Sequence, residues 1–309
     1  MAANSWMQTP VGGDFINNRF VLTDIVAAIL NPDAYWGITH MWVACLEISL
    51  FVIGGISAWY LLQSRNTEFF LTSFKMMIVA AIFIAPLQVG LGDGAGKSVF
   101  HSQPAKLAAI EAHWETNPPG EGAAWNIVAW PDKLLQDNRW AIQVPYALSL
   151  ITTYSPTGRV TGLQEFPVTD QPPVLLTFYS FRIMLFIGFG LVLLMLWSLW
   201  AWRKGKFTPA TIGRQKWLLY SWIAAVPLSY IAMEAGWVTR EVGRQPWVIQ
   251  GVLRTEEGAS ALPAGTVAAS LLGFVAIYTL LFFLFLFFAK RILDKGPVLD
   301  SPPVTRKNR

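Results

Sequence analysis

The sequence predicts an all-α membrane protein: a polytopic bundle of transmembrane helices with five spans and a long outer loop. Three observations support this prediction. Hydrophobic residues make up 54% of the 309 residues and charged residues only 14%, whereas a soluble domain carries about 25% charge. Five apolar runs are long enough to cross a bilayer, which takes about 20 residues. Basic residues gather after the third run and after the fifth.

The five apolar runs divide the chain into alternating spans and loops. They cover residues 35–62, 69–91, 173–202, 217–237 and 265–289. The third contains a single charge, Arg182, and Pro227 predicts a kink in the fourth. The expected segments are an outer N-terminal segment (1–34), two helices (35–91), a long outer loop (92–172), two further helices (173–237), a second outer loop (238–264), and a last helix with a basic cytoplasmic tail (265–309).

The distribution of basic residues predicts the orientation, because Lys and Arg in short loops mark the cytoplasmic side. They gather at positions 203, 204, 206, 214 and 216, and in the tail at 290, 291, 295, 306, 307 and 309. Five spans place both groups on one side of the membrane. The N-terminus and the loops 92–172 and 238–264 are therefore predicted to lie outside.

The same composition excludes several classes of protein. Cys45 is the only cysteine, so neither a disulfide within the chain nor a cysteine-rich metal site is possible. The net charge of +4 comes from loops and tails and indicates no nucleic-acid partner. A transporter or channel would account for charges inside spans, but such folds often show an internal repeat, and none is visible.

A few polar groups lie inside the predicted spans, where an ionisable side chain is costly and usually has a partner. His40 lies about 8 Å into the first span and Met184 about 16 Å into the third, so both can meet in the outer leaflet. An imidazole facing a thioether forms an axial pair for a low-spin haem, and Arg182 could neutralise a haem propionate. Taken singly, His40 is more often a packing residue and Met184 core filler. Glu47 shares the face of His40, and Lys75 can reach the inner interface.

Three clusters stand in the predicted outer loops. Residues 92–97 (Gly-Asp-Gly-Ala-Gly-Lys) lack the spacing of a phosphate-binding loop and predict a turn that ends the second helix. Residues 106–111 (Lys-Leu-Ala-Ala-Ile-Glu) predict a helical segment that brings Lys106 and Glu111 close, with a solvated amphipathic helix as the alternative. Residues 241–247 (Glu-Val-Gly-Arg-Gln-Pro-Trp) follow the fourth span, with an ordinary loop and one ion pair as the alternative.

Together these segments resemble subunit I of the cytochrome bd-type quinol oxidases. The similarity runs over most of the chain, and residues 241–247 form part of its longest and most specific motif. Three regions match: the family's quinol-loop signature, its low-spin haem helix and the signature after its eighth helix. The matching segments are, in chain order, 92–93, 103–104, 106–111, 145–148, 181–184, 234–237, 241 and 243–247.

The resemblance implies haem-binding roles. His40 and Met184 would be the axial ligands of a low-spin haem b, with Arg182 beside it. Glu241 would ligate the iron of a high-spin haem, with Arg244 near its propionates. The cofactors implied are low-spin haem b, high-spin haem b, and haem d or a haem b in its place.

The resemblance also implies a reaction on the outer face. Lys106 and Glu111 would belong to the quinol site, with Asp93 near it, and Glu111 can take a proton as quinol loses electrons. Electrons would pass through the haems, with Trp237 between them, to reduce O2 to water. Protons for water would come from inside, so the reaction charges the membrane without pumping. The partners implied are ubiquinol or menaquinol, oxidase subunit II and a small accessory subunit, in the bacterial cytoplasmic (inner) membrane.

The family has nine helices in this subunit, and the five spans resemble the fifth to the ninth. Residues 3–10 resemble the stretch just after the fourth helix. We therefore expect an N-terminally truncated chain or a split gene, in which another polypeptide supplies the missing helices and the N-terminal histidine of the oxygen-reducing site. The alternative is a haem b-binding remnant or split subunit without oxidase activity of its own.

Overall fold

The computed structural model describes residues 1–17 and 19–298. Within them, five helices are long and apolar enough to cross a membrane, which confirms the predicted number of spans. The chain divides into two compact units, Met1–Gly258 and Ala259–Arg309. The first unit holds four of the spanning helices, and the second holds the fifth.

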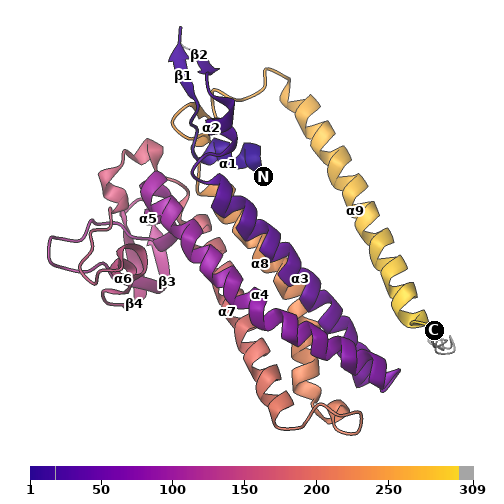
Figure 1. Cartoon of the computed structure of the whole chain (residues 1–309). Coiled ribbons are helices and arrows are strands. Elements are labelled where there is room, and N and C mark those ends of the chain that lie inside the picture. The colour runs from indigo at the N-terminus through magenta and orange to yellow at the C-terminus, as the bar shows by residue number, and fades with distance from the viewer. Residues whose placement is uncertain (18, 299–309) are drawn as a thin grey trace, which may run out of the picture. The chain divides into compact units, whose positions relative to one another are not determined.

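Four spanning helices form a bundle in the first unit: α3 (Ala34–Leu62), α4 (Thr67–Ser102), α7 (Val174–Arg203) and α8 (Lys216–Val242). Helix α3 packs against α4 and α8, and α7 packs against the same two helices (Figure 1). Helices α3 and α7 therefore stand at opposite corners. A group held between them would lie in the interior of the bundle.

Aromatic packing around Trp222 forms part of the bundle core. The Trp222 ring lies 5.0 Å from that of Phe51 and 5.1 Å from that of Phe74, measured between centroids. Its indole N–H donates to the Ser198 hydroxyl at 2.8 Å, as a buried indole requires. Gly54 makes room for this ring, because a Cβ there would overlap it.

Two helices extend beyond their predicted ends. The predicted turn at residues 92–97 is wrong, because α4 continues through it to Ser102. Gly94 has a packing role instead: a Cβ there would overlap the Trp36 ring on α3. Pro104 disfavours helical geometry at Gln103 and separates α4 from the next helix. Helix α8 continues through Pro227 and ends at Val242, five residues beyond the predicted 237.

Shorter elements cover one end of the bundle. Three two-stranded antiparallel sheets are among them, and none of these was predicted from the sequence. Two of the sheets contain bulges, which break the strict alternation that reveals a strand. The elements are α1 (Ala2–Gln8), β1 (Gly13–Ile16), β2 (Arg19–Leu22), α2 (Ile25–Ile29), α5 (Pro104–Glu111), β3 (Trp125–Asp132), β4 (Asp137–Val144), α6 (Ala147–Thr153), η1 (Leu163–Glu165), η2 (Val168–Asp170), β5 (Trp247–Ile249) and β6 (Leu253–Arg254).

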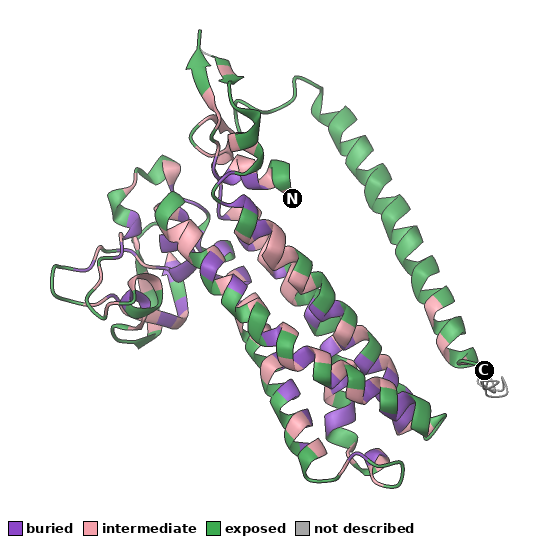
Figure 2. Cartoon of the chain, viewed as in Figure 1, coloured by how far each residue is buried: buried purple, intermediate pink, exposed green. Residues whose placement is uncertain are grey.

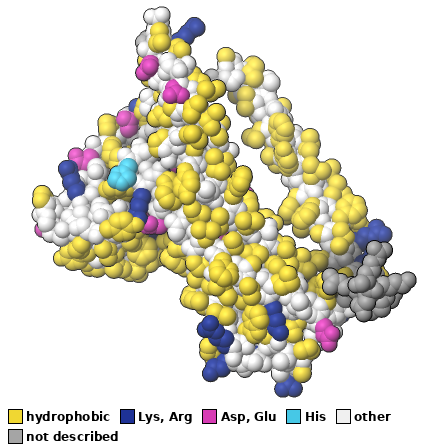
Figure 3. Space-filling model, viewed as in Figure 1, with side chains coloured by type: hydrophobic (Ala, Val, Ile, Leu, Met, Phe, Trp, Pro, Cys, Tyr) yellow, Lys and Arg dark blue, Asp and Glu magenta, His cyan; other side chains and the backbone are white. Residues whose placement is uncertain are grey.

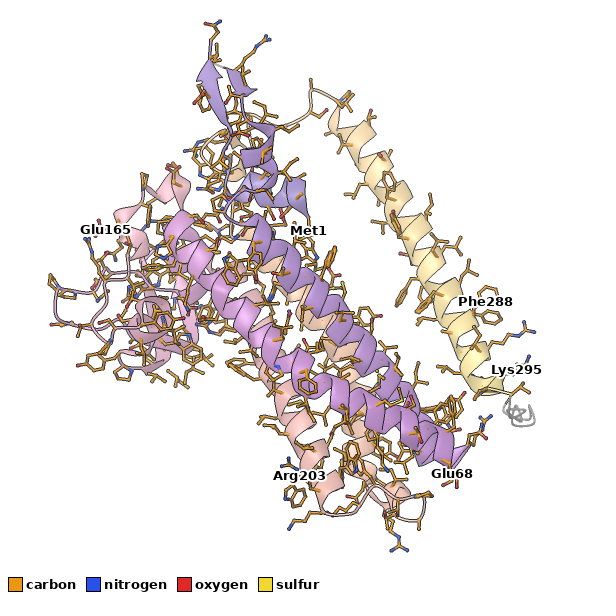
Figure 4. All side chains as sticks on the ribbon, viewed as in Figure 1. Met1, Glu68, Glu165, Arg203, Phe288 and Lys295 are labelled. Atoms are coloured by element: carbon orange, nitrogen blue, oxygen red, sulfur yellow. The ribbon has the colours of Figure 1, made fainter. Side chains whose placement is uncertain are left out.

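The two ends of the bundle differ in charge and content. Met1 and Glu165 lie at one end, whereas Glu68 and Arg203 lie at the other (Figure 4). The far end also carries η3 (Ile212–Arg214) and the basic connection between α7 and α8, and Lys and Arg side chains gather there (Figure 3). The segments predicted to be outside therefore share one end of this unit. Their placement on the outer side of the membrane stays a prediction.

The fifth spanning helix, α9 (Ala264–Lys295), forms the second unit. None of its residues is fully buried (Figure 2). Near its end, the Lys290 ammonium pairs with the Asp294 carboxylate at 2.5 Å. The predicted tail residues Arg306, Lys307 and Arg309 lie outside the described residues. An apolar surface on all sides is typical of a helix that meets lipid or another apolar surface.

Candidate functional site

Helix α5 brings the two predicted quinol-site residues into the protein interior. It packs against α7 and the end of α4. Lys106 and Glu111 are each only 5% exposed, so the alternative of a solvated amphipathic helix is wrong. The two side chains reach different partners, and each defines one half of the candidate site.

Glu111 forms a buried ion pair with Arg182. A guanidinium Nη2 of Arg182 donates to the Glu111 Oε2 at 2.5 Å, and the two side chains are 3% and 7% exposed. The sequence predicted that Arg182 needs a counter-charge inside the membrane, and the structure supplies a carboxylate from the adjoining loop. The Nη1 of Arg182 has no hydrogen-bond partner among the described residues.

Strand β3 holds this ion pair in place through Asn126. The Asn126 carbonyl accepts from the Nε of Arg182 at 3.0 Å and from its Nη2 at 2.6 Å. The Asn126 amide donates to the Glu111 carbonyl at 2.9 Å. Sequence reasoning missed Asn126, because one asparagine in a loop without regular alternation carries no signal of its own.

Lys106 belongs to the other half of the site. Its ammonium nitrogen donates to Gln8 Oε1 at 3.0 Å and to the Arg240 carbonyl at 2.9 Å. Burial, and after it the positive charge of Arg240, lowers the pKa of Lys106 to about 7. The chain passes close by at Gly243, where a Cβ would come within 3.0 Å of the Lys106 side chain.

Arg240 connects α8 to two segments that are far from it in the sequence. Its guanidinium pairs with Asp33 at the start of α3 and donates to Asn4 of α1 at 2.5 Å. Asn4 in turn donates to the Glu241 carboxylate at 2.6 Å, and Arg244 pairs with the other oxygen of Glu241 at 2.7 Å. Sequence reasoning missed Arg240 and Asp33, since each stands beside a predicted span boundary where charges are ordinary.

Arg244 is buried with part of its guanidinium unused. It is 5% exposed, and its Nε and Nη1 have no hydrogen-bond partner among the described residues. Burial lowers the pKa of this guanidinium, but an arginine stays charged near neutral pH. Two buried N–H donors without partners fit an anionic group that the protein atoms do not provide.

His40 and Met184 stand at opposite corners of the bundle, on α3 and α7. The Nε2 of His40 lies 3.4 Å from the side-chain nitrogen of Gln88, and its Nδ1 is buried without a partner among the described residues. A Cβ on Gly92 of α4 would come within 3.4 Å of the His40 ring, and one on Gly236 of α8 within 2.9 Å of the Met184 sulfur. Each candidate ligand thus faces a glycine on a neighbouring helix.

Asp93 and Trp237 lie apart from these contacts. Asp93 is exposed on α4, where its carboxylate accepts from Lys97 at 2.5 Å and from the Tyr154 hydroxyl at 3.3 Å. Trp237 is half-buried on α8, one turn before Glu241. Among the described residues, therefore, neither Asp93 nor Trp237 forms a hydrogen bond with Lys106 or Glu111.

Comparison with known proteins identifies the family. The model of the cytochrome bd terminal oxidase subunit I family matches residues 1–297. The chain belongs to that family. Subunit 1 of the cytochrome bd ubiquinol oxidase of Bacillus subtilis is 34% identical over 97% of this chain, and subunit 1 of the cytochrome bd-II ubiquinol oxidase of Escherichia coli is 30% identical over 96%.

A solved bd oxidase has the same fold. The bd oxidase from Geobacillus thermodenitrificans superposes with a TM-score of 0.84 at 30% identity, and the match covers 95% of this chain. This bd-family chain spans about two thirds of its relatives: 65% of the Bacillus subtilis protein, 69% of the Escherichia coli protein and 66% of the solved chain.

The bd-family chain fits haem as a cofactor by its own chemistry. Buried side-chain nitrogens of His40, Arg182 and Arg244 have no hydrogen-bond partner among the described residues. Imidazole nitrogen binds iron, and guanidinium groups bind carboxylates such as haem propionates. Gly92 and Gly236 keep side-chain volume away from His40 and Met184.

Proposed function

We propose that this chain is the haem-bearing subunit I of a cytochrome bd-type quinol oxidase, in a bacterial cytoplasmic membrane. The observation that carries the proposal is the set of buried, unpartnered nitrogen atoms on His40, Arg182 and Arg244. The resemblance to the family implies a haem-related role for all three residues. A buried donor without a partner costs about 1–3 kcal/mol, so a bound group that satisfies several of them would be strongly retained.

His40 and Met184 are the proposed axial ligands of low-spin haem b. His40 lies on α3 and Met184 on α7, the helices at opposite corners of the bundle. Both residues are in the N-terminal half of their helix. Bound haem would supply reversible one-electron transfer. The protein would orient the imidazole and thioether and keep water out between α3 and α7. Arg182 is two residues from Met184. Its guanidinium could therefore pair with a haem propionate in addition to the Glu111 carboxylate.

Lys106 and Glu111 are the proposed quinol-binding residues, with Asp93 proposed near the site. Glu111 is the proposed proton acceptor, because a quinol must lose its hydroxyl protons when it is oxidised. Arg182 pairs with this carboxylate at 2.5 Å and fixes its orientation. Lys106, with a pKa of about 7, can donate a hydrogen bond to a quinol oxygen in either protonation state.

Glu241 is the proposed ligand of a high-spin haem, with Arg244 at its propionates and Trp237 between haems. Asn4 and Arg244 each hold one carboxylate oxygen of Glu241, which fixes its orientation. The remaining haem would be haem d or a haem b in its place, and the final acceptor O2. Electron transfer would charge the membrane without proton pumping, and ubiquinol or menaquinol, subunit II and an accessory subunit would be partners.

The second candidate is a haem b-binding chain without oxidase activity of its own. It is favoured by the location of both proposed low-spin ligands, His40 and Met184, within one bundle of this chain. The two candidates differ in a measurable way. An oxidase would show high-spin haem signals and quinol-dependent O2 consumption in its native membrane, whereas the second candidate would show low-spin haem b alone.

Reduced-minus-oxidised spectra of the full chain in membranes test the proposal. We expect a low-spin haem b spectrum in the wild type and its loss in His40→Ala, and His101→Ala serves as the control because His101 is exposed on the same side. The amount of folded protein is followed by size-exclusion chromatography. An unchanged spectrum in His40→Ala would show that His40 is not a ligand, and no haem in the wild type would overturn the whole proposal.

A further inference from the structure

The β3–β4 hairpin exposes large apolar side chains as well as burying some. Its inner face packs into the loop core, where Ala129 joins Trp114 and Phe178. Two bulges adjust the register, so that Trp130 and Trp140 are both exposed, 44% and 51%. A hairpin with one face in water normally alternates apolar and polar residues, and this one does not.

The exposed apolar residues of the two paired strands and their turn are here called the hairpin patch: Trp130, Leu134, Leu135, Trp140, Ile142 and Val144. Leu134 and Leu135, at the hairpin turn, are 96% and 66% exposed. In the space-filling view, hydrophobic side chains line the lower edge of the loop region at the left of the molecule (Figure 3). Contiguous exposed apolar surface on this scale marks a site of contact with a membrane or another protein.

The position of the hairpin along α7 identifies the contact as lipid. The Tyr179 hydroxyl donates to the Ala129 carbonyl at 2.8 Å, and Arg182 donates to the Asn126 carbonyl. These two α7 residues lie about 8 and 12 Å from the helix start at Val174. The helix has 30 residues, about 45 Å, which matches a bilayer with its headgroup regions. The hairpin therefore lies beside the outer turns of a spanning helix, near the boundary between the headgroups and the hydrocarbon core.

The patch continues the lipid-facing surface of α7. The Trp130 ring packs edge-on against Tyr179, with 6.4 Å between centroids, and α7 exposes Leu176 and Ile183 near the same level. Tryptophan and tyrosine are the residues that settle at membrane–water interfaces. Leucines at the turn suit the apolar side of that interface.

We propose that the hairpin patch is inserted in the outer lipid–water interface and fastens the quinol loop to the bilayer surface. This placement depends on the contacts with α7 and not on the proposed function. If the proposed function also holds, the consequence is a quinol site that lies beside the bilayer surface. Asn126, on the same hairpin, holds Glu111 and Arg182, so a lipid-soluble substrate would meet these residues at the membrane surface.

Spin-label accessibility in vesicles tests the proposal. The full chain, with Cys45→Ser to remove the native thiol, carries a nitroxide at Leu134→Cys or Leu135→Cys. It is reconstituted into vesicles of phosphatidylethanolamine and phosphatidylglycerol. Collision rates are measured with O2, which concentrates in lipid, and with a water-soluble nickel chelate. Glu121→Cys is the matched control, because Glu121 is an exposed polar residue of the same loop.

We expect the ratio of O2 to nickel collisions to be at least several-fold higher at 134 and 135 than at 121. Equal ratios at the three positions would place the hairpin in water and overturn the proposal. Low collision rates with both reagents at 134 and 135 would also overturn it, because they would show that a protein surface covers the patch. Both leucines are exposed at the turn, so the substitutions leave the loop core intact.

Discussion

The guanidinium of Arg182 donates to the carboxylate of Glu111 at 2.5 Å, although 71 residues separate them in the chain. One residue comes from a membrane-spanning helix and the other from the loop helix α5. The contact joins the proposed low-spin haem site to the proposed quinol site, since Arg182 is two residues from Met184. Truncation of either side chain, with no hydrogen-bonding group in its place, would leave the other charge buried and unpaired, which is strongly destabilising.

Replacement of Glu111 by Gln should impair quinol oxidation and spare the haem. The amide keeps a hydrogen bond to Arg182 but cannot accept a quinol proton, so we expect the rate with a soluble quinol to fall about 100-fold. The low-spin haem b spectrum should keep its amplitude. Glu115→Gln, at an exposed position on the same loop, is the control and should keep its rate. Loss of the haem spectrum in Glu111→Gln would contradict the separation of the two sites.

Lys106 should make stability depend on pH above neutrality. Its pKa is about 7 in the folded protein against a usual value of 10.5, so the unfolded chain binds more protons between these values. The contribution of Lys106 to the free energy of unfolding is therefore greatest above pH 10.5 and decreases as the pH falls to about 7. The decrease is at most about 1.4 kcal/mol per pH unit.

Thermal unfolding in detergent between pH 6 and 9 measures this effect. The melting temperature should rise above pH 7 in the wild type, and the rise should be smaller in Lys106→Met. Lys204→Met replaces an exposed lysine at the other end of the bundle and should keep the wild-type profile. The same pH profile in Lys106→Met and the wild type would show that this lysine titrates normally.

The Arg240–Asp33 pair should contribute to stability as a coupled unit. Arg240→Gln or Asp33→Asn alone should lower the unfolding free energy by about 3 kcal/mol, because each leaves the partner charge buried. The double variant should lose less than the sum of the two singles. The exposed Lys290–Asp294 pair offers a matched control, in which Lys290→Gln should change nothing measurable. Additive effects of Arg240→Gln and Asp33→Asn would refute the coupling.

Cysteine labelling should place the two ends of the bundle on opposite sides of the membrane. In a Cys45→Ser background, Glu121→Cys should react with a membrane-impermeant maleimide on intact spheroplasts. Lys204→Cys should react only after the membrane is permeabilised, because the basic connection is expected inside. Labelling of position 121 from the cytoplasmic side alone would reverse the orientation.

The sequence pattern predicted candidate residues, whose roles stay predictions, but it did not predict their contacts. It paired Lys106 with Glu111 by helical spacing, but Lys106 reaches Gln8 and Arg240 instead, and Glu111 reaches Arg182. It interpreted Gly94 as part of a turn, but this glycine allows α3 and α4 to approach. Local spacing cannot decide such contacts, because the partners come from other segments.

The five spans and the family could be predicted from local sequence, because hydropathy over about 20 residues and a run such as 241–247 are properties of neighbouring residues in the chain. Only the tertiary structure decided that Arg240 links Asp33 to Asn4 and that the β3–β4 hairpin lies beside α7. The physical reason is that a buried charge or an apolar face is satisfied by whatever the packed helices bring within reach, and that depends on the arrangement of the whole bundle.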